Sequence, residues 1–220
     1  DGVLTYCGLT NLGVAFDPQI DGRKVNLKVM TQLENNLVLW DENSGEPIQQ
    51  VWGWLEKDGP TGPKMPERPT FRMPFWAFER AYPDGKVFLN TLPGALENPF
   101  LAVYDRLIHK MFTWAVGNQA NKENPTFPTI KRSDTRLPNK EKVYVGSVGD
   151  DHVAFTPEYI RAHGDVLNVK IGGVDVVVAY HPDYDSSGMY RNETGRTVSQ
   201  IAFGGNTEHG ALPRLETMKA

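Results

Sequence analysis

The sequence predicts a β-rich α+β fold, in which two related β units carry one long helix and one or two short helices packed outside them. Three observations support this prediction. The 21 glycines and 16 prolines among 220 residues favour turns and short strands over long helices. Short segments that alternate polar and apolar residues recur along the chain, as half-buried strands do. Similar segments occur near the two ends of the chain, which indicates an internal repeat.

The first half of the chain is expected to form strands and turns. Alternating or apolar runs predict strands within residues 1–16 and over 23–30, 37–40 and 48–55. Asp21-Gly22 is a hairpin signal, and residues 41–45 have the composition of a turn. Four prolines make residues 58–70 an extended connection on the surface.

Helices are predicted in the middle of the chain. Residues 75–82 lie between two prolines, and their aromatic side chains are expected to pack on the sheet, before a short strand at 87–89. Residues 98–116 give the clearest helix, capped by Asn98 and stopped by Gly117. Its apolar face consists of Leu101, Tyr104, Leu107, Ile108, Met111, Phe112 and Ala115. Residues 117–142 are predicted to form a long loop.

The last third of the chain is predicted to be mostly strand. Strands are expected over 143–148, 152–155, 167–171 and 174–180, with a short helix over 156–163. The strand at 174–180 is apolar on both of its faces. Strands of this kind are buried on both sides, so this one is expected at the centre of its sheet.

Two collinear matches define the internal repeat. Residues 3–7 correspond to 177–181 and residues 21–25 to 194–198, with offsets of 174 and 173 residues. We therefore expect a single compact domain, 1–220, made of two repeat-related halves at about 1–95 and 136–220, joined by a helix and loop at 96–135. The second copy has an upstream half at about 143–176. Its counterpart in the first copy is expected to lie outside this sequence.

Composition excludes several classes of protein. With 40% hydrophobic and 23% charged residues, the chain is not intrinsically disordered. A net charge of −4 argues against a broad basic surface, so no nucleic-acid partner is expected. No apolar run approaches the roughly 18 residues of a membrane span. Cys7 is the single cysteine, which excludes an intrachain disulfide and an all-cysteine metal cage.

The order of several short motifs resembles one known family. The motifs are Thr5-Tyr6-Cys7-Gly8-Leu9-Thr10, Gly13-Val14-Ala15-Phe16-Asp17, the run at 33–45, the Trp76 to Pro83 segment, the run at 136–143 and Gly172-Gly173. Together they are similar to the family called domain of unknown function 3179, over most of the chain except about 95–130. The family's second cysteine is Thr10 here, so a redox Cys-x-x-Cys role is not available. The resemblance implies export to the periplasm or the cell exterior and gives no activity.

The repeat also points to a candidate metal site. Cys7 and His181 occupy equivalent positions after the first strand of each copy, and both residue types bind copper or zinc. His163 precedes the strand that leads to His181 and is the third candidate ligand. Tyr6, Tyr180 and Asp183 would line a pocket at these strand ends. The alternative is that Cys7 is a buried apolar residue and the histidines are structural.

Other candidate groups are weaker. His109 with Met111 could bind copper, but Met111 lies on the apolar helical face. Asp41, Asp183 and Asp185 lack the spacing of a calcium loop. Ser186 and Ser187 near His181 could supply a hydroxyl nucleophile, but no third orienting group is visible.

Three functional hypotheses follow. The first is an exported binding protein that holds a ligand or transition metal at the Cys7 and His181 positions. The second is a structural or accessory subunit with protein partners in a larger assembly, suggested by the long amphipathic helix and the Trp-rich segments at 51–54 and 75–78. The third is an enzyme, which ranks last because no catalytic residue set is complete.

Overall fold

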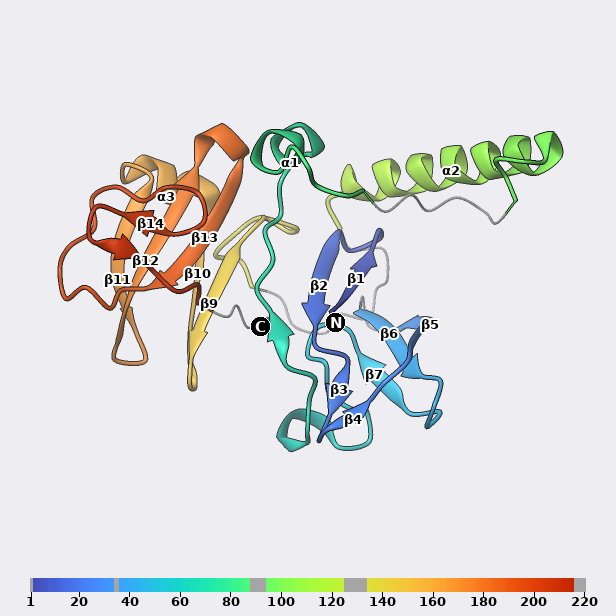
Figure 1. Cartoon of the computed structure of the whole chain (residues 1–220), viewed down its shortest axis with the longest axis horizontal. Coiled ribbons are helices and arrows are strands. Elements are labelled where there is room, and N and C mark those ends of the chain that lie inside the picture. The colour runs from blue at the N-terminus through green and yellow to red at the C-terminus, as the bar shows by residue number, and fades with distance from the viewer. Residues whose placement is uncertain (1, 34–35, 88–93, 125–133, 216–220) are drawn as a thin grey trace.

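The computed structural model describes residues 2–33, 36–87, 94–124 and 134–215. It contains two β units, one drawn in blue and cyan and the other in yellow to red, with helix α1 (Phe75–Ala81) between them and helix α2 (Pro99–Ala120) extending to one side (Figure 1). The predicted β-rich α+β class is confirmed. None of the helices in the described ranges has the length and apolar character needed to span a membrane.

The first unit is built from short antiparallel strands. They are β1 (Val3–Cys7), β2 (Leu12–Phe16), β3 (Gln19–Ile20), β4 (Arg23–Lys24), β5 (Leu27–Leu33), β6 (Asn36–Asp41), β7 (Pro47–Gln49) and β8 (Glu67–Arg68), with a 3-10 helix, η1 (Gly59–Thr61). They form the sheets β1-β2-β8, β3-β4 and β5-β6-β7. The core of this unit includes Cys7, Val14, Phe16, Ile48 and Met65.

The second unit contains a three-stranded sheet, β11-β12-β13, and the pairs β9-β10 and β14-β15. Its elements are β9 (Tyr144–Val148), β10 (Asp151–Phe155), α3 (Pro157–Ala162), β11 (Val166–Ile171), β12 (Val174–His181), the 3-10 helix η2 (Pro182–Tyr184), β13 (Ser186–Arg191), β14 (Asn206–Thr207) and β15 (Gly210–Ala211). β12 is the central strand and is buried on both faces, as predicted from its apolar sequence.

Two core clusters lie on opposite faces of β12. Val176, Val178 and Tyr180 pack with Ile160 of α3 and Phe155 of β10. The intervening residues Val177 and Ala179 pack with Tyr190, Val198 and Leu212. This alternation follows from the two-residue period of a strand.

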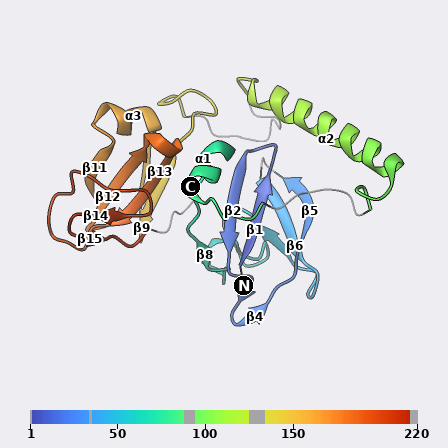
Figure 2. The ribbon, with the colours of Figure 1, turned by 45° about the horizontal axis from the view of Figure 1, so that its top comes forward.

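The long helix α2 departs from its prediction in two ways. Asn98 caps it by accepting hydrogen bonds from the N–H groups of Phe100 and Leu101, as expected, but the helix continues past Gly117 to Ala120. Much of its apolar face is also left uncovered by the two units. Leu107 is 54% exposed and Trp114 is 71% exposed, and both ribbon views show α2 projecting away from the second unit (Figures 1 and 2).

Several other predicted details are corrected. The strand expected at 23–30 is divided between β4 and β5, and most of β5 is exposed. The strand expected at 48–55 ends at Gln49 in a turn, and the aromatic residues Phe75 and Trp76 of α1 are exposed rather than packed on a sheet. Of the short strand expected at 87–89, positions 88 and 89 lie outside the described residues.

The two units contain hairpins of the same geometry. β1 pairs with β2 from Val3↔Phe16 to Cys7↔Leu12, and β12 pairs with β13 from Val177↔Tyr190 to His181↔Ser186. Each of these pairs in the first hairpin becomes a pair in the second when 174 is added to both residue numbers.

Hydrogen bonds outside the strands follow the same correspondence. The Tyr6 hydroxyl donates to Asn11 Oδ1 at 3.0 Å, and the Tyr180 hydroxyl donates to Asp185 Oδ1 at 2.8 Å. Both acceptor residues have a positive φ, at 55° and 43°. Further along, Asp17 N–H donates to the Pro66 carbonyl and Arg191 N–H to the Pro213 carbonyl, both at 2.8 Å.

Candidate functional site

A buried polar cluster lies on one face of the second hairpin. Because side chains alternate along a strand, the register of β12 and β13 places His181, Ser186 and Tyr190 on the same face. Arg214 forms an isolated bridge with Tyr190 on the other side of β13. We call these four residues the His181–Arg214 cluster.

His181 is held neutral in this cluster. The residue is only 6% exposed, and burial lowers the pKa of its imidazole. The Arg214 charge lowers this pKa further, against the opposing effect of Asp165. The Tyr190 hydroxyl lies 3.4 Å from His181 Nε2. Burial raises the pKa of Tyr190, so this phenol stays protonated and can donate a hydrogen bond.

Arg214 carries the positive charge of the cluster. Its Nη2 donates to the Thr70 carbonyl, and its guanidinium lies 3.6 Å from the centre of the Phe71 ring. Its Nε is buried and has no hydrogen-bond partner. Among the described residues no ion pair involves Arg214, so its charge is balanced by no carboxylate there.

Ser186 adds a second unsatisfied group. It is fully buried, and its hydroxyl oxygen has no hydrogen-bond partner. Ser186 therefore does not donate to His181, although the two are paired across β12 and β13. A nucleophilic hydroxyl needs a hydrogen bond to its base, so this geometry does not favour the Ser–His chemistry considered from sequence. The Ser186 hydroxyl and Arg214 Nε are thus the two buried polar groups of the cluster that have no hydrogen-bond partner.

Aromatic side chains from distant segments surround the cluster. Phe203 packs edge-on against His181, with ring centres 5.5 Å apart, and also contacts Phe71 and Tyr184. Tyr82, at the end of α1, reaches the same Phe203. The segment from Thr70 to Tyr82 thus connects the first unit to the cluster and limits its access to water.

The first hairpin lacks this polar character at the same positions. The register pairs place Cys7, Leu12 and Phe16 where the second hairpin has His181, Ser186 and Tyr190. On the next strand, Glu67 pairs with Phe16 as Arg214 pairs with Tyr190. At these three positions the first hairpin is therefore apolar and the second is polar, although the buried face of β1 also carries Thr5, which accepts a hydrogen bond from buried Gln50.

A comparison with protein families matches residues 1–216 to the family described as protein of unknown function, DUF3179. The chain belongs to the DUF3179 family. Neither the curated proteins nor the solved structures contained a match. The His181–Arg214 cluster is thus a feature of this DUF3179 chain for which the family description supplies no role.

The structure of this DUF3179 chain places the predicted metal ligands in different surroundings. Cys7 is buried in the core of the first unit, whereas His181 lies in the second. The His163 Nδ1 lies 2.8 Å from the Tyr159 carbonyl, and its ring stacks on Tyr159. Over the described ranges, no group of three or more His, Cys, Asp or Glu side chains could hold a metal ion. Cys7 and His181 were inferred from equivalent positions in two copies, and equivalent positions need not be adjacent in space.

The predicted pocket residues are separated as well. Tyr6 is 59% exposed on the first unit. Tyr180 points to the opposite face of β12 from His181, and its pKa is raised to about 12 by burial and by its bond to Asp185. Asp183 is exposed and pairs with Arg80 of α1 at 3.5 Å. Of the predicted metal ligands and pocket residues, only His181 belongs to the cluster.

Sequence reasoning missed Tyr190 and Arg214. The signal for Tyr190 was present, because it aligns with Phe16 and differs from it by one buried hydroxyl. Arg214 follows a proline, and no pattern in the neighbouring sequence marks it as a site residue.

Two open depressions of about 320 and 380 Å³ also lie in the second unit, and the cluster lines neither of them.

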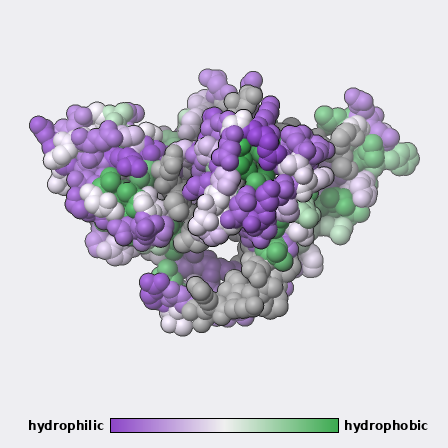
Figure 3. All heavy atoms as spheres, turned by 90° about the horizontal axis from the view of Figure 1, so that it is seen from below, coloured by the Kyte–Doolittle hydropathy of each residue, from purple (hydrophilic) through white to green (hydrophobic). Residues whose placement is uncertain are grey.

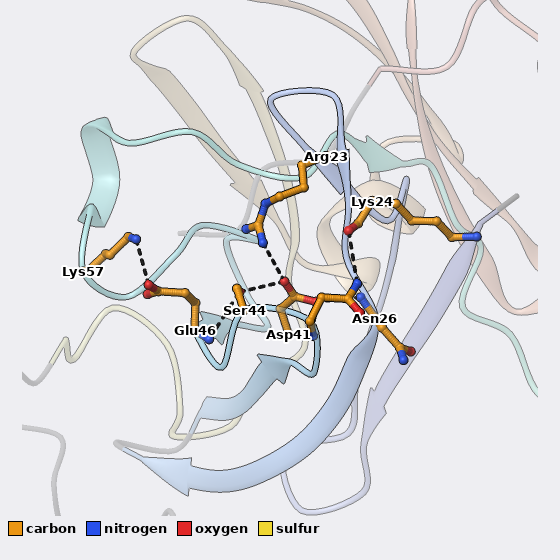
Figure 4. Close-up of polar contacts among 8 residues, drawn as sticks. Arg23, Lys24, Asn26, Asp41, Ser44, Glu46 and Lys57 are labelled. Atoms are coloured by element: carbon orange, nitrogen blue, oxygen red, sulfur yellow. Dashed lines mark hydrogen bonds and ion pairs between the residues drawn. The ribbon is translucent and has the colours of Figure 1, made fainter.

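A second polar network in this DUF3179 chain is structural. The Asp41 carboxylate is fully buried and accepts hydrogen bonds from Asn26 N–H at 2.8 Å, Ser44 Oγ at 2.7 Å and Arg23 Nη1 at 2.9 Å (Figure 4). Burial alone would raise the pKa of Asp41, but these hydrogen bonds, one from Asn43 N–H and the Arg23 charge together lower it. All acceptor sites face protein donors, so the network fixes the turn after β6 rather than offering a ligand site.

Proposed function

We propose that this chain is an internally duplicated binding protein whose second copy binds a small oxyanion, such as a carboxylate or phosphate, at the His181–Arg214 cluster. The duplication is supported by the shared register of the two hairpins and by their matching Tyr–Asn and Tyr–Asp hydrogen bonds. The family resemblance supports export to the periplasm or the cell exterior as the setting for this binding.

The unbalanced charge of Arg214 carries the proposal. Arg214 is half-buried, and its Nε is sealed from solvent without a hydrogen-bond partner, so a bound anion would offset the cost of that desolvation. Guanidinium groups suit oxyanions because their N–H groups match two oxygens at once. The Tyr190 and Ser186 hydroxyls add neutral donors, and a neutral His181 can accept or donate one hydrogen bond. The aromatic residues around the cluster lower the local dielectric, which strengthens each of these contacts.

Anion binding should stabilise the folded chain, since only the folded state has the site. At an anion concentration 100 times the Kd, the gain is about 2.7 kcal/mol, which corresponds to a rise in Tm of roughly 5–10 °C for a chain of this size. The measurement is thermal unfolding in inorganic phosphate or acetate, against sodium chloride of equal ionic strength.

Arg214→Gln should weaken this binding at least tenfold and remove the rise in Tm. Arg196→Gln is the matched control, because Arg196 is exposed and the net charge of the variant is the same. A rise in Tm that Arg214→Gln leaves intact would rule out the cluster as the site. The absence of any anion-specific rise in the unaltered chain would reject oxyanion binding itself.

A second candidate function, a subunit that assembles through α2, is favoured by the exposure of this helix. Phe112 and Val116 face Gly8 in the first unit, so that side of α2 is occupied. Another side carries large apolar residues exposed to solvent, and hydrophobic atoms gather at the end of the molecule where α2 lies (Figure 3). This outer face consists of Phe100, Val103, Tyr104, Leu107, Met111 and Trp114. Monomeric proteins seldom expose a continuous apolar surface of this kind.

The outer face of α2 suits a second copy of the same helix. Phe100 and Trp114 lie seven residues on either side of Leu107, and Val103 and Met111 lie four residues on either side. In two antiparallel helices related by a twofold axis at Leu107, the large apolar residues of one helix would therefore pack against those of the other. The six side chains together offer about 800 Å² per copy, which is the size of a standard stable interface.

Leu107→Glu should convert an α2-mediated dimer into a monomer, because it places two like charges at the twofold axis. Thr113→Glu, on the polar side of the helix, should leave the dimer intact. The molar mass of each protein is measured by light scattering during size-exclusion chromatography. A chain that is monomeric at about 100 μM, or a dimer that survives Leu107→Glu, would contradict assembly through this face.

A further inference from the structure

The outer face of β1 is exposed where the equivalent face of β12 is buried. Leu4 is 69% exposed and Tyr6 is 59% exposed. The residues at the same register positions in the second hairpin are Val178, which is fully buried, and Tyr180, which is 8% exposed. The two hairpins therefore have similar apolar outer faces, of which only the second is covered.

The second unit shows what covers such a face. α3 places Ile160, which is fully buried, in the same cluster as Val178 and Tyr180, and Arg161 of α3 lies 5.2 Å from the centre of the Tyr180 ring. After a short turn the chain enters β11, which pairs with β12 from Val166↔Ala179 to Ile171↔Val174. One continuous segment, residues 156–171, thus supplies both the helix over the face and the strand along the edge.

The first unit has no such strand among its described residues. Its sheet order is β1-β2-β8, so β1 is an edge strand, whereas β12 lies between β11 and β13. At the opposite edge the two hairpins are alike. β2 pairs with β8 in the first unit, and β13 forms a bridge with Arg214 in the second. The two sheets therefore differ at a single edge, and an exposed edge with apolar side chains is the usual site of strand addition.

We propose that the open edge and outer face of β1 are the docking site for a helix-and-strand segment with the pattern of residues 156–171, namely the first copy's own counterpart of α3 and β11. The strand pairs antiparallel with β1, and the helix covers Leu4 and Tyr6. This inference rests on the duplication and not on anion binding, so a failure of the Arg214 experiment leaves it untouched.

The proposal is tested by supplying such a segment. A copy of residues 156–171 is fused ahead of Gly2 through a flexible glycine–serine linker in the full chain. Hydrogen exchange of the amides at 3–7 is then compared with that of the unfused chain. We expect exchange at 3–7 to slow at least tenfold, toward the rate at 177–181, and the Tm to rise.

The control fusion carries the two changes equivalent to Ile160→Lys and Val169→Lys within the added segment, which remove its apolar face. This control should leave exchange at 3–7 unchanged. Equal exchange rates in the two fusions would overturn the proposal. The proposal would also be overturned if exchange at 3–7 in the unfused chain became slower as the protein concentration rose. In that case a second copy would occupy the edge.

Discussion

Replacing Val178 by aspartate is expected to lower the free energy of unfolding by about 3 kcal/mol or more. Val178 is fully buried at the centre of β12, between β11 and β13 and under α3. An aspartate there would place an unpaired carboxylate among apolar side chains. At about 2–4 °C per kcal/mol for a chain of this size, the Tm should fall by roughly 10 °C.

Leu4→Asp is the matched control for this change. Leu4 occupies the same register position in the first hairpin but is 69% exposed, so its replacement should leave the Tm nearly unchanged. Circular dichroism during thermal unfolding measures both variants. A Val178→Asp protein that melts with the unaltered chain would refute the central position of β12. An equal loss in both variants would show that the outer face of β1 is also covered.

Replacing Asp41 by alanine is expected to cost about 3 kcal/mol near neutral pH. The change removes the acceptor for two backbone N–H groups, of Asn26 and Asn43, and for the Ser44 hydroxyl in a fully buried site. The loss of the Arg23 ion pair adds little, because the Arg23 side chain is 45% exposed and its charge can be solvated. Unfolding in urea at pH 7 measures the difference.

The cost of Asp41→Ala should also depend on pH in one direction. The folded-state pKa of Asp41 lies below its unfolded value of about 3.9, so its contribution is complete above that pH. It is lost as the pH falls through the folded-state pKa. The difference between the two proteins should therefore be constant from pH 5 to 7 and shrink below about pH 4.

Glu46→Gln provides the control for the Asp41 experiment. Glu46 pairs with Lys57 at 2.8 Å in the same region, but the Lys57 side chain is 55% exposed (Figure 4). Exposed ion pairs contribute little to stability, so this variant should unfold like the unaltered chain at every pH. If Glu46→Gln and Asp41→Ala were equally destabilising, burial of the Asp41 carboxylate would not be the reason for its effect.

The sequence alone determined the elements whose signals are local. The two-sided apolar pattern of 174–180 placed β12 at the centre of its sheet, and Asn98 correctly marked the start of α2. The correspondence of 3–7 with 177–181 predicted two similar hairpins, and the structure places those residues in the same register. Side-chain period and capping depend on neighbouring residues, so they can be read without knowledge of the fold.

Tertiary structure decided which faces are covered and which polar groups meet. The apolar pattern of α2 indicated a buried face, yet Leu107 and Trp114 are exposed. An amphipathic sequence shows which face of a helix could be buried, but it does not show whether another part of the protein packs against that face. Cys7 and His181 hold equivalent positions but lie in different units, and no metal-binding group was found over the described ranges. Arg214 meets Tyr190 and His181 only because the chain returns alongside β13 after 23 intervening residues between Tyr190 and Arg214. Contacts of that kind depend on how the chain closes on itself, and no local pattern of residues encodes them.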